Sequence, residues 1–400
     1  MNSQHKILIC ITGGIAAYKI PALVRLIKKN NCECKIIMTS SAENFVSPMV
    51  LAALSENKIW HDKDLLSEDY GSSIPHIKLS EWADLIVIAP CSANTLAKIS
   101  NGIADNLLTS TVIASKCPVL IFPAMNSNMY ENYFTQKNLL NLKNAGYKLI
   151  EPDSGELACG TSGKGRMPEP EIIMLEILRA LEKNILSGKK ILITAGPTLE
   201  YLDPVRFISN PSTGKMGLAM ARAAWMKGAE IKLIAGPVDS SLNFYGFDVI
   251  KIISARDMLQ AVLNNLGWAD YIVKAAAVGD YRAENISEKK IKRENKNNIQ
   301  INLIQNPDIA SEIGKLKRGD QILIGFAAET DDLINNARKK LLSKNLNYIL
   351  VNDVLEKNSG FGTDTNTLKL ISRDQNFPEQ NFTGLKIDIA SQIWNVIASR

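Results

Sequence analysis

Two glycine-bearing loops are the parts of this sequence whose residue types point most directly to ligand binding. The loop Thr12-Gly13-Gly14-Ile15-Ala16 follows the apolar run Ile7–Ile11. A second loop, Asn210–Gly217 (NPSTGKMG), ends a longer stretch that opens after Ile191–Ile193 and precedes an alanine-rich helical pattern. A strand, a glycine loop and a helix in this order present backbone N–H groups to a phosphate. The chain therefore has two candidate sites for phosphorylated ligands.

The residues at the ends of the second strands argue against an NAD-dependent dehydrogenase or an NADPH-dependent reductase. Neither glycine loop reads G-x-G-x-x-G. A dinucleotide site also needs an acidic side chain near the end of the second strand to hold the ribose. The chain has Met38-Thr39-Ser40 at that position in its first half and Ala235-Gly236-Pro237 in its second. Hydroxyl groups such as that of Thr39 suit a terminal phosphate like that of FMN.

Small and polar residues follow two later strands of the first half. Ser92-Ala93-Asn94-Thr95 would let a flat ring approach the backbone, and Asp105 could serve ribityl or ring polar atoms. Pro123–Tyr130, which follows the next strand, contains Asn126. The types and positions of these residues suit a flavin.

Three further features allow both a structural and a functional interpretation. His76 is one of only three histidines, and a single histidine is more often structural than catalytic. Cys159 would by default be a buried spectator, but its glycine-flanked loop, Ala158–Gly163, could close as a flap. The basic patch Lys289–Lys296 is either a solvated loop or a clamp for an anionic ligand. It lacks interleaved aromatic residues, so a nucleic-acid partner is disfavoured.

Polar and cationic residues gather at the predicted strand ends of the second half. Arg206 and Asn210 flank the second glycine loop with a cation and an amide. The other members of this set are Lys274–Arg282, Lys290-Ile291-Lys292, Asn306–Ile309, Gly325–Thr330 and the helix cations Lys340 and Lys344. Cations near a triphosphate, with a metal ion to gather its oxygens, are what phosphoryl chemistry requires.

Alternating strands and helices must position these residues. In the first half the apolar runs predict strands at 7–11, 35–38, 85–89, 119–122 and 148–150, with helices at 16–29, 44–54, 95–100, 106–115, 130–144 and 169–186. In the second half they predict strands at 191–194, 230–235, 249–252, 271–275, 322–326 and 348–351, with helices at 215–227, 255–266, 333–342 and 385–399. The pattern indicates two α/β domains, each a doubly wound, mostly parallel sheet. Residues 279–306 break it and are expected to form a mobile loop or a hairpin.

Composition places the chain among ordinary globular proteins. It has 400 residues, of which 46% are hydrophobic, and a formal net charge of +5. No apolar run approaches the roughly 20 residues needed to span a bilayer, and no signal sequence is evident. The six cysteines all precede residue 160 and lack metal-site spacing. We expect a cytoplasmic protein with no membrane partner.

The motifs of the first half resemble those of the flavin-dependent cysteine decarboxylases. They are GGIAAYK, the histidine of PHI, APCSANT, a PxMNxxM core and the cysteine of ACG; Tyr130 stands where the family usually has tryptophan. The resemblance implies a flavodoxin-like domain that binds FMN and decarboxylates a peptide-like C-terminal cysteine. His76 is the expected base, Asn126 the binder of the substrate carboxylate and Cys159 the proton donor. The expected FMN contacts are Gly13, Gly14, Ile15, Ala16, Thr39, Ser92, Ala93, Asn94, Thr95 and Asp105.

The motifs of the second half resemble those of the CTP-dependent phosphopantothenate–cysteine ligases. They are GPT, RFISNPSTGKMG, AAAVGDYR, KIK, GFAAET and ND. The resemblance implies a Rossmann-like domain in which Asn210, Arg206 and Lys290 are catalytic, with Mg²⁺ or Mn²⁺ as the metal and Ser212-Thr213-Gly214 near the substrate phosphate. Alignment with the family's KIK motif favours Lys290 over Lys289. The expected CTP contacts are Lys274, Ala275, Ala276, Asp280, Lys290, Pro307, Asp308, Ile309, Ala310, Phe326, Lys340 and Lys344.

The order of the two halves matches the bifunctional bacterial enzymes of coenzyme A biosynthesis. Residues 1–188 would then be the decarboxylase and 189–400 the ligase. The implied substrates are 4′-phosphopantothenate, cysteine and CTP, joined through an acyl-cytidylate and then decarboxylated to 4′-phosphopantetheine. The family also implies trimeric decarboxylase modules with the flavin at their contacts and dimeric ligase modules, which combine into a dodecamer. A non-catalytic FMN-binding scaffold of the same fold is the alternative.

Overall fold

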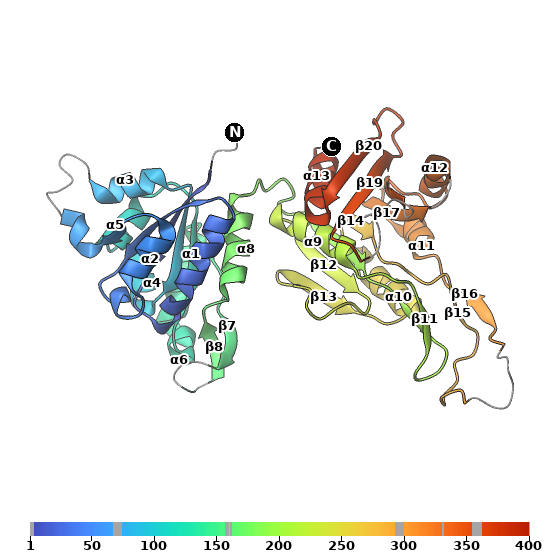
Figure 1. Ribbon diagram of the computed structural model, residues 1–400, viewed down its shortest axis with the longest axis horizontal. Coiled ribbons are helices and arrows are strands. Elements are labelled where there is room, and N and C mark those ends of the chain that lie inside the picture. The colour runs from blue at the N-terminus through green and yellow to red at the C-terminus, as the bar shows by residue number, and fades with distance from the viewer. Residues whose placement is uncertain are drawn as a thin grey trace. The chain divides into compact units, whose positions relative to one another are not determined.

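The computed structural model describes residues 4–66, 74–156, 160, 162–292, 300–329, 332–353 and 362–399. The chain divides into two compact units, Met1–Glu182 and Lys183–Arg400. Each unit has a central sheet with helices on both faces (Figure 1). The two predicted α/β domains are confirmed.

The first unit is built on a six-stranded parallel sheet in the order β3-β2-β1-β4-β5-β6. Without the three-residue edge strand β3, this is the flavodoxin-like order 2-1-3-4-5. Its strands and the hairpin that follows them are β1 (Lys6–Ile11), β2 (Glu33–Met38), β3 (Ile59–His61), β4 (Leu85–Cys91), β5 (Val119–Pro123), β6 (Lys148–Leu149), β7 (Asp153–Glu156) and β8 (Ser162–Arg166). Its α-helices are α1 (Ile20–Lys29), α2 (Pro48–Ser55), α3 (Pro75–Trp82), α4 (Ala93–Ser100), α5 (Leu107–Ala114), α6 (Ser127–Glu131), α7 (Tyr133–Asn144) and α8 (Pro170–Leu181). Three 3₁₀ turns, η1 (Ile15–Lys19), η2 (Ala42–Asn44) and η3 (Asp62–Leu66), complete it.

Strand β1 shows why this sheet is covered on both faces. Ile7, Ile9 and Ile11 pack with α1, α2 and α8, whereas Leu8 and Cys10 pack with the helices of the opposite face. Successive residues of a strand point to opposite faces, so a continuous apolar run marks a strand that is buried on both sides.

The second unit has an eight-stranded sheet in the order β13-β12-β9-β14-β17-β18-β19-β20. The first six strands are parallel in a Rossmann-like order, and β19 and β20 are antiparallel additions that the sequence did not predict. The strands of this unit are β9 (Lys190–Ala195), β10 (Leu199–Tyr201), β11 (Phe207–Ser209), β12 (Glu230–Ala235), β13 (Phe247–Lys251), β14 (Tyr271–Lys274), β15 (Tyr281–Ala283), β16 (Leu303–Gln305), β17 (Ile322–Glu329), β18 (Tyr348–Asp353), β19 (Thr365–Ser372) and β20 (Gln380–Leu385). Its helices are α9 (Lys215–Met226), α10 (Ala255–Leu266), α11 (Ile309–Leu316), α12 (Leu333–Ser343) and α13 (Lys386–Ala398).

Two hairpins leave this second sheet, and Figure 1 shows β11, β15 and β16 extending away from it. In one hairpin β10 pairs with β11, and in the other β15 pairs with β16, with Tyr281 opposite Gln305. The second hairpin lies within residues 279–306, where the alternating pattern breaks. A hairpin was one of the two structures expected for this segment.

Several predicted helices differ in their ends, and two of these differences have a local cause. The helix predicted from residue 16 begins as η1, and α1 starts only at Ile20 with Pro21 in its first turn. Proline suits that place because its missing N–H would have no partner there. The helix predicted at 130–144 is divided at Asn132, whose side chain accepts a hydrogen bond from the N–H of Phe134 at 2.9 Å. The helix predicted at 169–186 ends at Leu181.

Candidate active sites

The first candidate site is a cavity of about 660 Å³ at the carboxyl ends of β1, β4 and β5. Open α/β sheets bind ligands at this edge, where neighbouring strands lead to helices on opposite faces. The Thr12 hydroxyl donates to the carbonyl of Pro90 at 2.7 Å and accepts from the N–H of Ser92 at 2.9 Å. Thr12 therefore joins the loop after β1 to the loop after β4.

The cavity is lined by seven of the residues expected to bind FMN or substrate. They are Gly13, Gly14, Ile15, Ala16, Ser92, Ala93 and Asn126. Gly13 must be a glycine, because a Cβ atom there would lie 2.5 Å from the Cβ of Ser41. Ser92 caps α4 by accepting a hydrogen bond from the N–H of Thr95 at 3.3 Å. Asn126 caps α6 in the same way, with its side-chain oxygen 2.9 Å from the N–H of Asn128.

Other predicted residues of the first unit lie outside this cavity lining. Thr39 is buried at the end of β2, and its hydroxyl has no hydrogen-bond partner among the described residues. Asn94 is exposed and Thr95 is buried in the first turn of α4. Asp105 is half exposed and forms an ion pair with Lys98 at 2.7 Å.

Neither His76, the predicted base, nor Cys159, the predicted proton donor, is among the described residues that line the cavity. His76 lies in the first turn of α3 and is not among the lining residues. In Figure 1, α3 lies near the end of the sheet opposite to α6 and to the β7–β8 hairpin. Cys159 lies outside the residues that the structure describes.

The β7–β8 hairpin forms one wall of the cavity through Glu156, Gly165 and Arg166. The Gly165 carbonyl accepts a hydrogen bond from the N–H of Met125 at 3.1 Å. This contact holds the hairpin against the loop that carries Asn126.

Two cations of the cavity, Lys19 and Arg166, were missed by the sequence analysis. Lys19 is only 5% exposed, and its Nζ donates to the Met167 carbonyl and to Glu169 Oε1, both at 2.9 Å. Arg166 donates to the same Glu169 oxygen at 2.6 Å. The Lys19 ammonium and these contacts hold the pKa of the Glu169 carboxyl below its usual value, against the opposing effect of burial. The sequence feature that could have identified Lys19 is the presence of a lysine within an apolar stretch.

These features fit a flat heteroaromatic ligand with an anionic arm. Ile15, Met125 and Met129 offer apolar faces, while Ser92 and the N-terminal turn of α4 offer hydrogen-bond donors for a phosphate. Lys19 and Arg166 add positive charge to the lining, which Glu169 offsets in part. The residues present are thus compatible with FMN.

The second candidate site is a cavity of about 250 Å³ at the carboxyl ends of β14 and β17 and the start of α11. It gathers ten of the twelve residues expected to contact CTP: Lys274, Ala276, Asp280, Pro307, Asp308, Ile309, Ala310, Phe326, Lys340 and Lys344. Ala275 and Lys290 are the two that do not line it.

Three lysines and two aspartates line this second cavity. Lys274 is 8% exposed, and burial lowers the pKa of its ammonium to about 8, while Asp308 opposes and Lys344 reinforces that effect. Lys344 Nζ lies 2.8 Å from a carboxylate oxygen of Asp308. Burial alone would raise the pKa of Asp308, but Lys344 and the N–H groups of Ser311 and Ala310 hold it below its usual value. The cavity suits a polyanion.

The predicted residues Arg206 and Asn210 lie on the β10–β11 hairpin, and Asn210 contacts Val278, which lines this cavity. Asn210 Nδ2 donates to the carbonyls of Ala277 and Val278 at 3.3 and 3.1 Å, which ties the end of β11 to the chain after β14. Arg206 Nη1 donates to Asp203 Oδ2 at 2.6 Å and to the Ile291 carbonyl at 2.9 Å. No other side-chain bond of Arg206 forms with the described part of the chain.

The second glycine loop ends at the N-terminus of α9. Gly214 adopts a left-handed conformation with φ 75°, and a Cβ atom there would lie 2.7 Å from Val238 Cγ1. Glycine meets both demands without strain. The following Lys215 forms an ion pair with Asp364 at 2.7 Å, so its charge is directed away from the loop toward β19.

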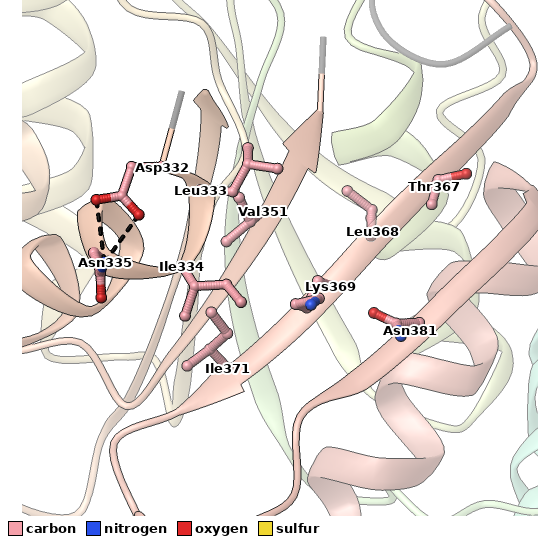
Figure 2. Close-up of a pocket in the computed structure, with 10 residues that line it drawn as sticks. All are labelled: Asp332, Leu333, Ile334, Asn335, Val351, Thr367, Leu368, Lys369, Ile371 and Asn381. Carbon is pink, nitrogen blue, oxygen red and sulfur yellow. Dashed lines mark hydrogen bonds between the residues drawn. The ribbon is translucent and has the colours of Figure 1, made fainter. Parts of the chain in front are cut away.

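A third cavity, of about 560 Å³, contains none of the predicted site residues (Figure 2). It lies between the start of α12 and strands β18, β19 and β20. Half of its lining residues are aliphatic, and Asn335 donates to both carboxylate oxygens of Asp332 at 2.9 and 3.1 Å. Asp332 and Lys369 are the charged residues among the lining residues that the structure describes.

Two further observations concern metals and membranes. Within the described ranges, no group of three or more His, Cys, Asp or Glu side chains is placed to hold a metal ion. No helix in the part of the chain that the structure describes has the length and apolarity needed to cross a membrane.

Comparison with known proteins agrees with the division of the chain into two units. The flavoprotein family model matches residues 1–182, and the model for the DNA/pantothenate metabolism flavoprotein C-terminal domain matches residues 186–400. The fold and the two family models thus define a flavoprotein unit followed by a second α/β unit of pantothenate metabolism.

Relatives of similar length carry both units. The chain is 42% identical to the coenzyme A biosynthesis bifunctional protein CoaBC of Bacillus subtilis, over 100% of this chain and 98% of the relative. It is also 42% identical to the CoaBC protein of Haemophilus influenzae, with the same coverage. A solved C-terminal domain of a CoaBC protein shares 37% identity and covers 54% of this chain and 97% of its own, with a TM-score of 0.45. This chain belongs to the family of coenzyme A biosynthesis bifunctional proteins.

Proposed function

We propose that this chain carries out two consecutive reactions of coenzyme A biosynthesis. Its second half, residues 189–400, joins cysteine to 4′-phosphopantothenate in a CTP-dependent reaction. Its first half, residues 1–188, decarboxylates the resulting 4′-phosphopantothenoylcysteine to 4′-phosphopantetheine with FMN. The observation that carries this proposal is the cationic cavity at the end of β14, where the expected CTP contacts gather. Family membership along the full chain supports it.

The ligase reaction has two displacement steps. A carboxylate oxygen of 4′-phosphopantothenate attacks the α-phosphorus of CTP, and the bond to the β-phosphate oxygen breaks to release pyrophosphate. The cysteine amine then attacks the acyl carbon of the acyl-cytidylate, and CMP leaves with the electron pair of the acyl–oxygen bond while the amine loses a proton. Both steps develop negative charge on phosphate oxygens, so fixed cations lower their barriers.

The residues around the second cavity can take distinct roles in these steps. Lys274, Lys340 and Lys344 would offset the charge of the triphosphate, and Phe326 would offer a ring face to the cytosine. Mg²⁺ or Mn²⁺ would be held mainly by the triphosphate oxygens, as is usual for Mg²⁺ with nucleotides. The acyl group would lie near Asn210 and Arg206, with the substrate phosphate at the N-terminus of α9 beside Ser212-Thr213-Gly214.

The first cavity would bind the second substrate with its carboxylate toward Asn126. A neutral amide stabilises a carboxylate less than a cation does. The carboxylate therefore loses less stabilisation when it leaves as CO2. FMN, when bound, supplies the two-electron oxidation of the cysteine moiety and its reversal. Ile15, Met125 and Met129 would exclude water from the reacting atoms, and Cys159 would donate the final proton.

His76 gives a structural reason to propose a homo-oligomer. It is the expected base, but it does not line the cavity of its own chain. A second copy that places its α3 at the cavity mouth would supply it, consistent with trimeric decarboxylase modules. Pairing of the ligase modules would then extend the assembly, up to a dodecamer. A cytoplasmic location fits a CTP-consuming enzyme.

Mixing two inactive variants tests this sharing of the first site. His76→Gln and Asn126→Ala should each abolish decarboxylation of added 4′-phosphopantothenoylcysteine. Co-expressed in equal amounts, they should recover about a quarter of wild-type activity, because random trimers then hold some sites with both native residues. A mixture that stays as inactive as either variant would show that both residues act within one chain.

The function as a whole is tested by one spectrum and one assay. The purified protein should show a flavin absorbance band, and it should release pyrophosphate only when CTP and 4′-phosphopantothenate are both present. Added cysteine should then lead to 4′-phosphopantetheine. A flavin band without any pyrophosphate release would favour the non-catalytic scaffold, and the absence of both would overturn the proposal.

A further inference from the structure

Asp203 is a buried carboxylate with an unusual number of hydrogen-bond donors. It lies in the turn between β10 and β11, and its side chain is fully buried. Four donors reach it: the backbone N–H groups of Val205, Arg206 and Ile291, and the guanidinium of Arg206. A buried charge is retained only where such partners replace water.

The two carboxylate oxygens of Asp203 serve different segments of the chain. Oδ1 closes the local turn by accepting from the N–H of Val205 at 2.7 Å and that of Arg206 at 2.8 Å. Oδ2 accepts from the Arg206 guanidinium at 2.6 Å and from the N–H of Ile291, 88 positions away in sequence, at 3.0 Å. One oxygen shapes the hairpin, and the other reaches the basic segment.

The peptide groups around Ile291 are held from both sides. The N–H of Ile291 donates to Asp203, and the Ile291 carbonyl accepts from Arg206 Nη1 at 2.9 Å. The same segment is fixed four residues earlier, where the N–H of Ser287 donates to the Leu202 carbonyl at 3.0 Å. Residues 287–292 are therefore docked along the β10–β11 turn.

This docking sets the positions of two exposed lysines, Lys290 and Lys292, on either side of Ile291. Neither ammonium group has a side-chain partner within the described ranges, so both are available to an anionic ligand. The same hairpin ends at Asn210, which is bonded to the carbonyls of Ala277 and Val278 beside the nucleotide cavity. Asp203 thus connects a cationic segment to a hairpin that borders the second site.

We propose that Asp203 is a positioning residue of the ligase, which fixes the backbone that carries Lys290 by bonding the Ile291 peptide to the Arg206 hairpin. This role rests on the proposed function. Burial alone would raise the pKa of the Asp203 carboxyl, but the N–H groups of Ile291, Val205 and Arg206 and the Arg206 guanidinium hold it well below its usual value. The carboxylate stays charged throughout the neutral range.

The variant Asp203→Asn separates the two roles of this side chain. Asparagine keeps one oxygen for Val205 and Arg206, so the turn survives. Its NH2 group then faces the Ile291 N–H and the Arg206 guanidinium, which are also donors, so the link to the basic segment is lost. The matched control is Asp374→Asn, because Asp374 closes a turn by the same i+2 contact, to the N–H of Asn376 at 2.9 Å.

Two measurements on the full chain test the proposal. Hydrogen exchange of the 287–292 peptide should accelerate in Asp203→Asn and stay unchanged in Asp374→Asn. The KM for CTP in pyrophosphate release should rise roughly tenfold, at the lower end of what loss of an orienting partner costs at metal sites. Decarboxylation of added 4′-phosphopantothenoylcysteine should stay at the wild-type rate, as a check on folding. Ile291→Pro, which removes the same hydrogen bond from the other side, should give the same pattern even if Asp203→Asn does not fold.

Each contrary outcome is distinct. Faster exchange with an unchanged KM for CTP would overturn the positioning role, and so would unchanged exchange or an equal defect in Asp374→Asn. Wild-type protein that releases no pyrophosphate with CTP would overturn the proposed function itself, while the exchange result would still report whether the link exists.

Discussion

Lys274 is a cation that the fold keeps in an environment unfavourable to charge. It ends β14 with its Nζ 3.9 Å from Met258 Sδ, and Asp308 and Lys344 are the charged groups that act on it. Burial lowers the pKa of its ammonium from an ordinary 10.5 to about 8. A depression of this size corresponds to about 3 kcal/mol of unfavourable free energy for the charged folded state. Such a cost is expected where a charge is kept for a ligand.

The titration of Lys274 should appear in the pH dependence of CTP binding. Below pH 8 the ammonium is charged and attracts the triphosphate, so the KM for CTP should rise as the pH passes through about 8. Lys274→Met should raise the KM at pH 7 and abolish that step, as measured by pyrophosphate release from pH 6.5 to 9.5. A step that persists in Lys274→Met would assign the titration to another group.

The titration of Lys274 also determines how the free energy of unfolding changes with pH. The folded state releases the Lys274 proton more readily than the unfolded state, so its contribution to the free energy of unfolding rises between about pH 8 and pH 10.5 and is constant below pH 8. Lys274→Met should therefore be at least as stable as wild type at pH 7, although it binds CTP less well.

At the scale of elements, the 3₁₀ turn η1 depends on a contact with a distant segment. Lys19 at its end bonds the Met167 carbonyl and Glu169, which lie between β8 and α8. The loop that faces the first cavity and the base of the β7–β8 hairpin are therefore held by one buried ammonium group.

Lys19→Met should loosen both of these elements together. Loss of a buried, hydrogen-bonded cation should lower the free energy of unfolding by about 1–3 kcal/mol and weaken FMN binding, as measured by denaturant titration and flavin fluorescence. The control is Lys28→Met, which removes a more exposed ion pair with Glu56 at 2.7 Å and should change neither quantity appreciably. Equal losses in both variants would rule out a specific role for Lys19.

The elements also show what could be predicted from the sequence. A continuous apolar run such as Ile7–Ile11 is stable as a strand of a sheet that is buried on both faces. The parallel core could therefore be predicted from the pattern of apolar residues alone. Lys274 could be predicted to lie beside Gly325 and Phe326 because neighbouring parallel strands bring their carboxyl ends to one edge.

The missed features depend on contacts between distant segments. Asp203 and Lys19 act on residues 88 and about 150 positions away, and no local pattern encodes such partners. Strands β19 and β20 were missed because their alternating, half-buried residues carry a weaker signal than the apolar runs of the central strands.

At the scale of the whole molecule, the division into Met1–Glu182 and Lys183–Arg400 predicts that the units can be separated. Each has its own sheet and its own buried core. Expressed separately, the first unit should bind FMN and decarboxylate added 4′-phosphopantothenoylcysteine, and the second should release pyrophosphate from CTP with 4′-phosphopantothenate. Circular dichroism and these two assays check the prediction. Loss of structure in either piece, with the full chain active, would show that the units need each other.

The indole of Trp394 has a consequence for the path by which the second unit folds. Trp394 is fully buried and donates its Nε1–H to the Met220 carbonyl at 2.9 Å, across 174 positions of sequence. Contacts of such high order cost loop entropy before they contribute stability, which slows folding. During synthesis, α9 must therefore wait for α13 to emerge from the ribosome before its buried face is covered. Until then that face is a surface on which chaperones could act.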